Sequence, residues 1–407
     1  MEQFYGINPE WIREYARLIV RTGVNVQKGQ EVVLNCPVEH YEFARLVIEE
    51  AYAAGAGEVI LRWSDTVENR LYYQNVLEER MKEVPEWKAE SVNSYARRGA
   101  CWISIGGTDP EGLKGVDPKK IHIRSQAMDA ALEEHYKLMM ASINPWTVAA
   151  VPQKQWAKKV FPDLSEKEAM KALWEKILKT VRIGEGDAVE RWAEHDRFLK
   201  EKCRFMNENA FTKLHYQNSL GTDFTVGLVK GHIWEGGSEK AGSGVIFEAN
   251  MPTEEIFTMP DNRVAEGKLV SALPLSYRGN LIRNFSFTFR NGEVIDYSAE
   301  EGYETLKSIV EGDEGSRRLG EVAIVPYSSP ISMMKLLFYN TLFDESHNRG
   351  GWCRHDRGGA ESRRRQFLHE PCGLYGRHCR SCNYRHQRGR HRSCHCRKRR
   401  LGSLTGF

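Results

Sequence analysis

EVVLNCPVEHYEFARLVIEEAYAAGAGEVILRW, residues 31–63, decides the fold class of this 407-residue chain. It begins with a short apolar run over 31–36 that suits a buried strand. A helical period over 40–55 follows and ends in glycine, and a second apolar run occupies 58–63. Two buried strands joined by a helix predict a parallel pair, because parallel strands need a crossover connection.

The same alternation continues toward the middle of the chain. Apolar runs suited to buried strands recur at 100–107 and 146–152, with helical stretches between them. We therefore expect an α/β domain over residues 1–184, with helices on both faces of a parallel sheet. The glycine-rich stretch 106–115 has neither a Gly-x-Gly-x-x-Gly pattern nor a Lys-Ser/Thr element, which argues against a phosphate-binding loop.

Residues 185–347 have a different pattern. The stretch 212–228 reads as strand, turn and strand, and 280–298 reads as a hairpin with an Asn-Gly turn. A helix is expected over 299–312, where a glycine closes it. These features predict an α+β domain rich in antiparallel pairs, which follows the α/β domain and contains the candidate metal ligands given below.

The charge is unevenly distributed along the chain. The whole sequence has 58 basic and 55 acidic residues, of which residues 348–407 contribute 16 and 3. That leaves 42 basic and 52 acidic residues in 1–347, a net charge of −10. A mildly acidic body favours an enzyme over a nucleic-acid binder.

The body also carries compartment signals. It has only three cysteines, far apart in sequence, as expected in a reducing compartment. Its N-terminus lacks the basic and apolar regions of a signal peptide, and no apolar run reaches the ~18 residues of a membrane helix. We therefore expect a cytoplasmic protein that does not associate with membranes.

The glycine-rich segment 234–261 contains the first candidate metal ligands. Glu254 and Glu255 directly follow a Pro-Thr pair. Carboxylates held on a rigid turn are suitable ligands for a divalent ion. The alternative is a helix start, with Thr253 as N-cap and both acids in the first turn. On the residues alone, this alternative is the favoured interpretation.

A second candidate region lies at 315–347. Glu321 opens an expected strand, and His347 ends a run that reads as helix or loop. A carboxylate at a strand start with a histidine nearby is compatible with a zinc site. The alternative is a solvated strand end and a surface histidine.

Several long motifs together are more specific than either region alone. EANMPTEEIFTMP, LGEVAIVPYSSPIS and LFYNTLFDE resemble, in order, motifs of the aminopeptidase T / aminopeptidase S (PepS-like) family of dinuclear metallopeptidases. WEGGSEKAGSG and LVSALPLSYRG fit the same pattern, so the resemblance covers essentially all of 1–347.

The resemblance implies a function and a set of ligands. It implies an aminopeptidase with two divalent ions (Zn²⁺, Co²⁺ or Mn²⁺), peptide substrates and a homodimer with enclosed active sites. The family's ligands fall on Glu255, Glu321 and His347, although the spacing before His347 is shorter than usual. The family's later elements, a catalytic Tyr and a His-x-Asp ligand pair, are not found, so no catalytic residue is assigned.

A shifted reading frame in the tail 348–407 would explain why the catalytic Tyr and the His-x-Asp pair are missing. It has 15 Arg, six Cys and six His, and no Val, Ile or Met. When residues 369–381 are read one base later, the genetic code permits HVDFMVGTADL, which matches the missing ligand element. We therefore expect the tail to be out of frame and disordered, and the peptidase activity of this chain to be impaired.

Two other functions are compatible with the residues. The Cys, His and Arg of the tail could bind Zn²⁺ and nucleic acid, although the spacing of Cys394 and Cys396 is poor for zinc. The chain could also be an inactive scaffold that keeps the fold and the dimer. Nucleic acid is the less favoured partner because the body is acidic.

Overall fold

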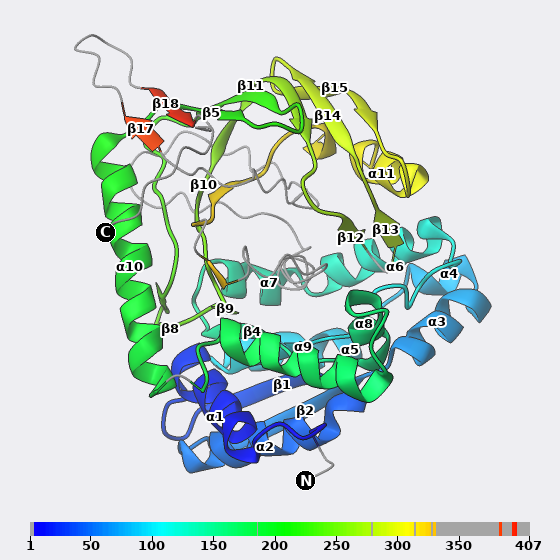
Figure 1. Ribbon diagram of the computed structural model, residues 1–407. Coiled ribbons are helices and arrows are strands. Elements are labelled where there is room, and N and C mark those ends of the chain that lie inside the picture. The colour runs from blue at the N-terminus through cyan, green and yellow to red at the C-terminus, as the bar shows by residue number, and fades with distance from the viewer. Residues whose placement is uncertain are drawn as a thin grey trace.

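The computed structural model describes most of the chain before the basic tail (Figure 1). The described residues are 4–184, 186–277, 280–312, 315–326 and 329–330, together with two short strands at 382–384 and 393–396. Within these residues no helix is both long and apolar enough to cross a membrane.

The first layer is a five-stranded parallel sheet with the strand order β2-β1-β3-β4-β9. Its first four strands lie where the apolar runs predict them. The strands are β1 (Glu31–Pro37), β2 (Glu58–Ser64), β3 (Cys101–Gly106), β4 (Trp146–Ala150) and β9 (Asn250–Met251). The predicted α/β fold of the first region is therefore confirmed.

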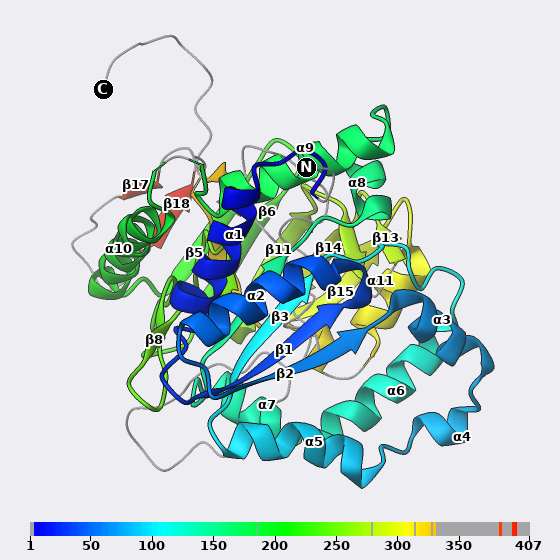
Figure 2. The ribbon, with the colours of Figure 1, turned by 90° about the horizontal axis from the view of Figure 1, so that it is seen from below.

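Helices cover both faces of this sheet (Figure 2). On one face lie α1 (Pro9–Leu18), α2 (Tyr41–Ala53) and α9 (Glu166–Thr180), and on the other α5 (Glu86–Arg97), α6 (Pro118–Ala131) and α7 (Glu133–Met140). Phe43 of α2 packs against Trp174 of α9 with ring centroids 6.0 Å apart. Both side chains are fully buried, as the core of a doubly covered sheet requires.

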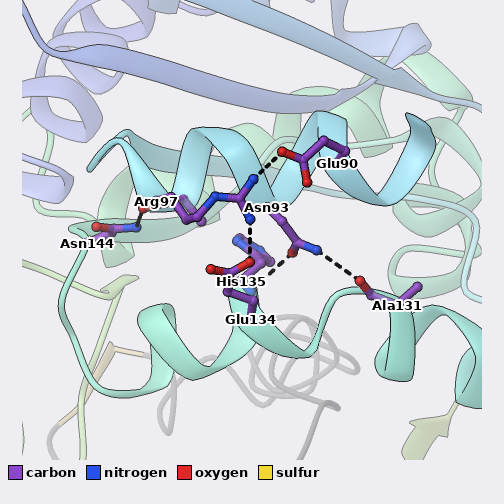
Figure 3. A network of polar contacts seen from close by, with 8 residues as sticks. Glu90, Asn93, Arg97, Ala131, Glu134, His135 and Asn144 are labelled. Carbon is purple, nitrogen blue, oxygen red and sulfur yellow. Dashed lines mark hydrogen bonds and ion pairs between the residues drawn. The ribbon is translucent and has the colours of Figure 1, made fainter. Parts of the chain in front are cut away.

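A polar network joins α5 to α7 among the helices that cover the second face of the parallel sheet, which we call the outer face (Figure 3). Arg97 forms ion pairs with Glu90 of its own helix and with Glu134 of α7. The Asn93 amide donates to the carbonyl of Ala131 over 3.0 Å. The charged groups are about half exposed, so this network is a surface contact between two helices.

The second sheet has the strand order β15-β14-β11-β6-β5-β18-β17 and is antiparallel from β15 to β5. The body contributes β5 (Lys213–Gln217), β6 (Asp223–Leu228), β11 (Pro260–Val270), β14 (Ser286–Arg290) and β15 (Glu293–Ser298). With α10 (Ala188–Asn209) and α11 (Tyr303–Val310) it encloses a second apolar core. The predicted α+β character is confirmed.

The predicted hairpin is shorter than expected. Its turn is the Asn-Gly pair, with φ of 53° at Asn291 and 81° at Gly292, but its first strand begins at Ser286. Residues 280–282 instead form β13 (Asn280–Ile282), which pairs with β12 (Leu275–Tyr277).

After β5 and β6 of the second sheet, the chain returns to the first sheet at β9 and then crosses back toward the second. The pair β7 (Glu239–Lys240) and β8 (Ile246–Phe247) leads to β9, which adds to the edge of the parallel sheet. The next strand is β10 (Ile256–Thr258), which pairs with β16 (Val322–Ile324) beside the second core. Helix α10 runs alongside the crossing (Figure 1). The parallel sheet thus takes its last strand, β9, from beyond residue 184. The domain boundary at residue 184 stays a prediction.

The described part of the tail is small. The strands β17 (Cys382–Tyr384) and β18 (Ser393–Cys396) pair with each other, and β18 lies parallel to β5. The rest of 348–407, and with it the expected disorder, lies outside the described residues.

Candidate metal centre

Residues 252–255 form the crossing segment between β9 and β10. Burial alternates along it and into β10: Glu254 and Ile256 are buried, whereas Glu255 and Phe257 are half-buried. Because side chains alternate between faces in extended chain, Glu254 and Glu255 point in opposite directions. The helix-capping alternative is wrong, because a strand begins at Ile256 and no helix follows Thr253.

The pairing of β10 with β16 places Glu255 and Glu321 on one face. Phe257 is paired with Ala323 in this antiparallel ladder. Glu255 lies two residues before Phe257, and Glu321 lies two residues before Ala323. With a side-chain period of two, both carboxylates follow the face of the Phe257–Ala323 pair.

The two carboxylates lie at opposite ends of this ladder. Glu255 precedes β10 and Glu321 precedes β16, and the strands run in opposite directions. Their positions differ by four residues in register, about 13 Å along the strand direction. Extending the ladder by one residue before each strand therefore puts Glu255 and Glu321 on the same face but not side by side.

The opposite face of the ladder packs on the second core. Ile256 and Val322 are buried there, and the Thr258 hydroxyl donates to the carbonyl of Ile233 over 2.7 Å. This packing fixes the strand pair against the core. The face that carries Glu255 is consequently the more open one.

Glu254 turns away from that open face and is held by Arg182. The guanidinium Nη2 lies 2.6 Å from Glu254 Oε1, with the two side chains 15% and 5% exposed. The same guanidinium lies over the ring of Trp192, 5.1 Å from its centroid. Glu254 is thus a buried carboxylate whose ion pair with Arg182 gives it a structural role.

His195 of α10 holds the neighbouring backbone. Its Nε2–H donates to the carbonyl of Thr253 over 2.7 Å. Burial lowers the pKa of His195 below its ordinary value of 6.5, so the ring is neutral at pH 7. The crossing segment is therefore anchored at two consecutive residues.

A cavity of about 350 Å³ opens beside these anchors. It is lined by Lys179, Arg182, Arg191, Glu194, His195 and Pro330. The cavity therefore borders the anchoring side chains Arg182 and His195 themselves.

A further buried acid lies just before the crossing. Glu248 is 3% exposed, and burial, with the negative charge of Asp196 nearby, raises its pKa to about 8. Its carboxyl is therefore mostly protonated at neutral pH. Sequence reasoning included Glu248 in a motif but gave it no role, because its burial depends on contacts distant in sequence.

The third predicted ligand cannot be placed. His347 lies outside the described residues, and in the part of the chain that the structure describes no three His, Cys, Asp or Glu side chains gather as a metal site would need. Glu255 and Glu321 have the hard oxygen donors that suit a divalent ion. The described chain thus contains two of the three predicted ligands, and their role stays a prediction.

Comparison with known proteins identifies the family. Residues 9–353 match the family described as thermophilic metalloprotease (M29). The chain belongs to this family. The match includes the parallel sheet, the second sheet from β15 to β5, and the strand pair that Glu255 and Glu321 precede, and it ends shortly after His347.

Curated relatives in the M29 family are aminopeptidases. The chain is 45% identical over 335 residues to aminopeptidase AmpS of Bacillus subtilis, covering 82% of each chain. It is 37% identical over 337 residues to aminopeptidase T of Thermus aquaticus, covering 83% of this chain and 82% of the relative. The fold also matches wild-type AmpT from Thermus thermophilus, with a TM-score of 0.76 and 35% identity over 83% of each chain.

Proposed function

We propose that this chain derives from an aminopeptidase that removes N-terminal residues from peptides, with Glu255, Glu321 and His347 as metal ligands. The M29 match over residues 9–353 carries the proposal. The aminopeptidase relatives and the shared face of Glu255 and Glu321 support it.

The match to a metalloprotease family supports a metal requirement. Bound divalent ions lower the pKa of a water and stabilise the charge that develops on the scissile carbonyl. Glu255 and Glu321 would hold such ions from opposite ends of the strand pair, and His347 would add a nitrogen ligand. We propose two ions, as the family resemblance implies. They are Zn²⁺, Co²⁺ or Mn²⁺, because mixed carboxylate and imidazole ligands discriminate poorly among these metals.

The tail is proposed to be a shifted reading frame. The family match stops at residue 353, close to where the composition changes. The relatives are about as long as this chain, since the matched stretch covers 82% of both. A relative therefore also has unmatched residues in about the same number as this chain, as expected if an out-of-frame tail replaces an in-frame one.

The activity class can be tested on protein from a gene repaired by removing one base after codon 347. We expect it to hydrolyse Leu-p-nitroanilide but not its N-acetylated form, because an aminopeptidase needs a free amine. Chelation with EDTA should abolish the activity, and divalent metal should restore it. Equal hydrolysis of both substrates, or activity that survives chelation, would contradict the proposal.

We also propose a homodimer in the cytoplasm, as the resemblance implies. The three body cysteines are free and buried, which suits a reducing compartment. Light scattering of the repaired protein should give twice the mass of one chain. A monomer at micromolar concentration would contradict the dimer.

A further inference from the structure

The end of α9 contains an unusual residue for its backbone conformation. The Arg182 N–H donates to the carbonyl of Lys179 over 3.1 Å, and the Ile183 N–H donates to the carbonyl of Leu178 over 2.9 Å. These bonds form the helix-ending motif whose left-handed position is usually glycine. Here that position is Arg182, with φ of 64°.

An arginine in the left-handed region is strained, and such a residue invites a functional explanation. The side chain supplies one. Its guanidinium makes the buried pair with Glu254, donates to the Thr180 carbonyl over 2.9 Å and lies over Trp192. Glycine would suit the backbone better but would remove all three contacts.

His195 approaches the same segment from another helix. Its ring is 8% exposed, and its hydrogen bond to Thr253 fixes the residue next to Glu254. Trp192, one turn earlier on α10, packs against both the guanidinium and the imidazole, with ring centroids of Trp192 and His195 5.9 Å apart. The two anchors therefore form one packed unit, which we call the crossing clamp (Arg182, Trp192, His195 and Glu254).

The clamp ends where the proposed ligand begins. Thr253 and Glu254 are held by the clamp, and the next residue, Glu255, is half-buried where Glu254 is buried, as expected for side chains that alternate between two faces. We propose that Arg182 and His195 are positioning residues that fix Glu255 before a metal ion binds. This inference rests on the proposed function, because it assumes that Glu255 is a ligand.

The physical reason is preorganisation. A ligand on a connecting segment must be ordered when the ion binds, unless the fold has already ordered it. Partners that orient metal ligands commonly change metal affinity by about 10–100-fold. Arg182 and His195 hold the two residues that precede the proposed ligand, and so act on it through the backbone.

The test compares variants of the full chain. Arg182→Gly removes the side chain and relieves the backbone, so it is chosen to fold. His195→Leu removes the donor to Thr253, and His195→Gln keeps a donor. Lys179→Ala is the matched control, because Lys179 lines the same cavity but is exposed on α9.

Hydrogen exchange without metal is the first measurement. We expect amides in 253–257 to exchange at least about tenfold faster in Arg182→Gly and His195→Leu, because the clamp no longer holds the segment. His195→Gln and Lys179→Ala should match the unaltered chain. Exchange in β1 reports global unfolding, so the acceleration in 253–257 is compared with that in β1 of the same variant, and only the excess is assigned to the clamp.

Cobalt affinity, followed by visible absorption, is the second measurement. Arg182→Gly and His195→Leu should bind Co²⁺ about tenfold more weakly, and His195→Gln should recover most of that loss. Unchanged exchange in both variants would overturn the clamp. Faster exchange with unchanged cobalt affinity would overturn the positioning role.

The same experiment separates this inference from the proposed function. If the unaltered chain and the repaired chain both bind no Co²⁺, the proposed metal function fails, and the positioning role fails with it. If both chains bind Co²⁺ but the clamp variants behave like the control Lys179→Ala, the positioning role fails and the proposed metal function stands.

Discussion

Two polar clusters of the molecule use the same kinds of residue in different surroundings. On the outer face, Arg97 bridges Glu90 and Glu134, with all three side chains 43–54% exposed. At the crossing between the sheets, Arg182 pairs with Glu254, with the side chains 15% and 5% exposed. Both clusters join segments that are distant in sequence.

The difference in burial changes how strongly each ion pair affects stability. An exposed pair contributes about 0–1 kcal/mol because water and salt screen it. A buried pair contributes little net stability, but removing one partner leaves an uncompensated charge and costs about 3–5 kcal/mol. The crossing cluster therefore constrains the chain strongly, and the outer network only fastens two helices.

The largest expected effect is at Glu255, the proposed ligand that directly follows the crossing cluster. Loss of a residue that orients a metal ligand lowers activity by up to about 100-fold. In the repaired protein, Glu255→Gln removes the proposed ligand itself, so Leu-p-nitroanilide hydrolysis should fall by more than about 100-fold. Glu90→Gln, the matched change in the outer network, should leave the rate unchanged. Equal rates for the two variants would show that Glu255 binds no essential metal.

The next effect is on stability. Arg182→Ala should lower the free energy of unfolding by about 3 kcal/mol, since it leaves Glu254 buried without its partner. Arg182→Gly should lose about 1 kcal/mol less, because glycine accepts the left-handed backbone without strain. Urea unfolding measures both changes, and identical losses would argue against backbone strain at Arg182.

The pH dependence of stability should come partly from Glu248, just before the crossing. Its pKa is raised in the folded protein from 4.5 to about 8. A raised pKa favours the protonated folded form, so this contribution is full below pH 4.5 and is lost as the pH rises toward about 8. Stability should fall on the order of 1 kcal/mol per pH unit within that window.

Replacement of this acid provides the check. Glu248→Gln has no proton to lose, so its urea midpoint should vary less between about pH 5 and pH 8 than that of the unaltered chain. Glu90→Gln should keep the original slope, because Glu90 is exposed. A slope that is the same in all three proteins would rule out Glu248 as its source.

The smallest effect is expected in the outer network. Arg97→Ala should lower the free energy of unfolding by less than about 1 kcal/mol, as for other exposed pairs. A loss as large as that of Arg182→Ala would break the comparison between the two clusters.

Local patterns predicted much of the fold. Continuous apolar runs marked the parallel strands because both faces of that sheet are buried, and the Asn291-Gly292 pair marked a turn that needs positive φ. The two-residue strand β9 carries no periodicity of its own. Its place beside β4 depends on contacts about 100 residues apart in sequence, which no local pattern contains.

The candidate site was predictable only in part. Motif resemblance located Glu255 and Glu321, whereas chemistry alone favoured a helix start at Thr253 that the structure does not have. Arg182 and His195 gave no signal, because they lie far from the motif and meet it only after folding. Where His347 lies relative to the two carboxylates stays a prediction.

The most direct test of the account compares the unaltered chain with the chain whose gene lacks one base after codon 347. Both should be assayed with Leu-p-nitroanilide and Co²⁺, after their intact masses confirm the two tails. We expect the repaired protein to be at least about 100-fold faster, because it regains the missing ligands. Equal rates would contradict the claim that the tail interrupts a metalloaminopeptidase.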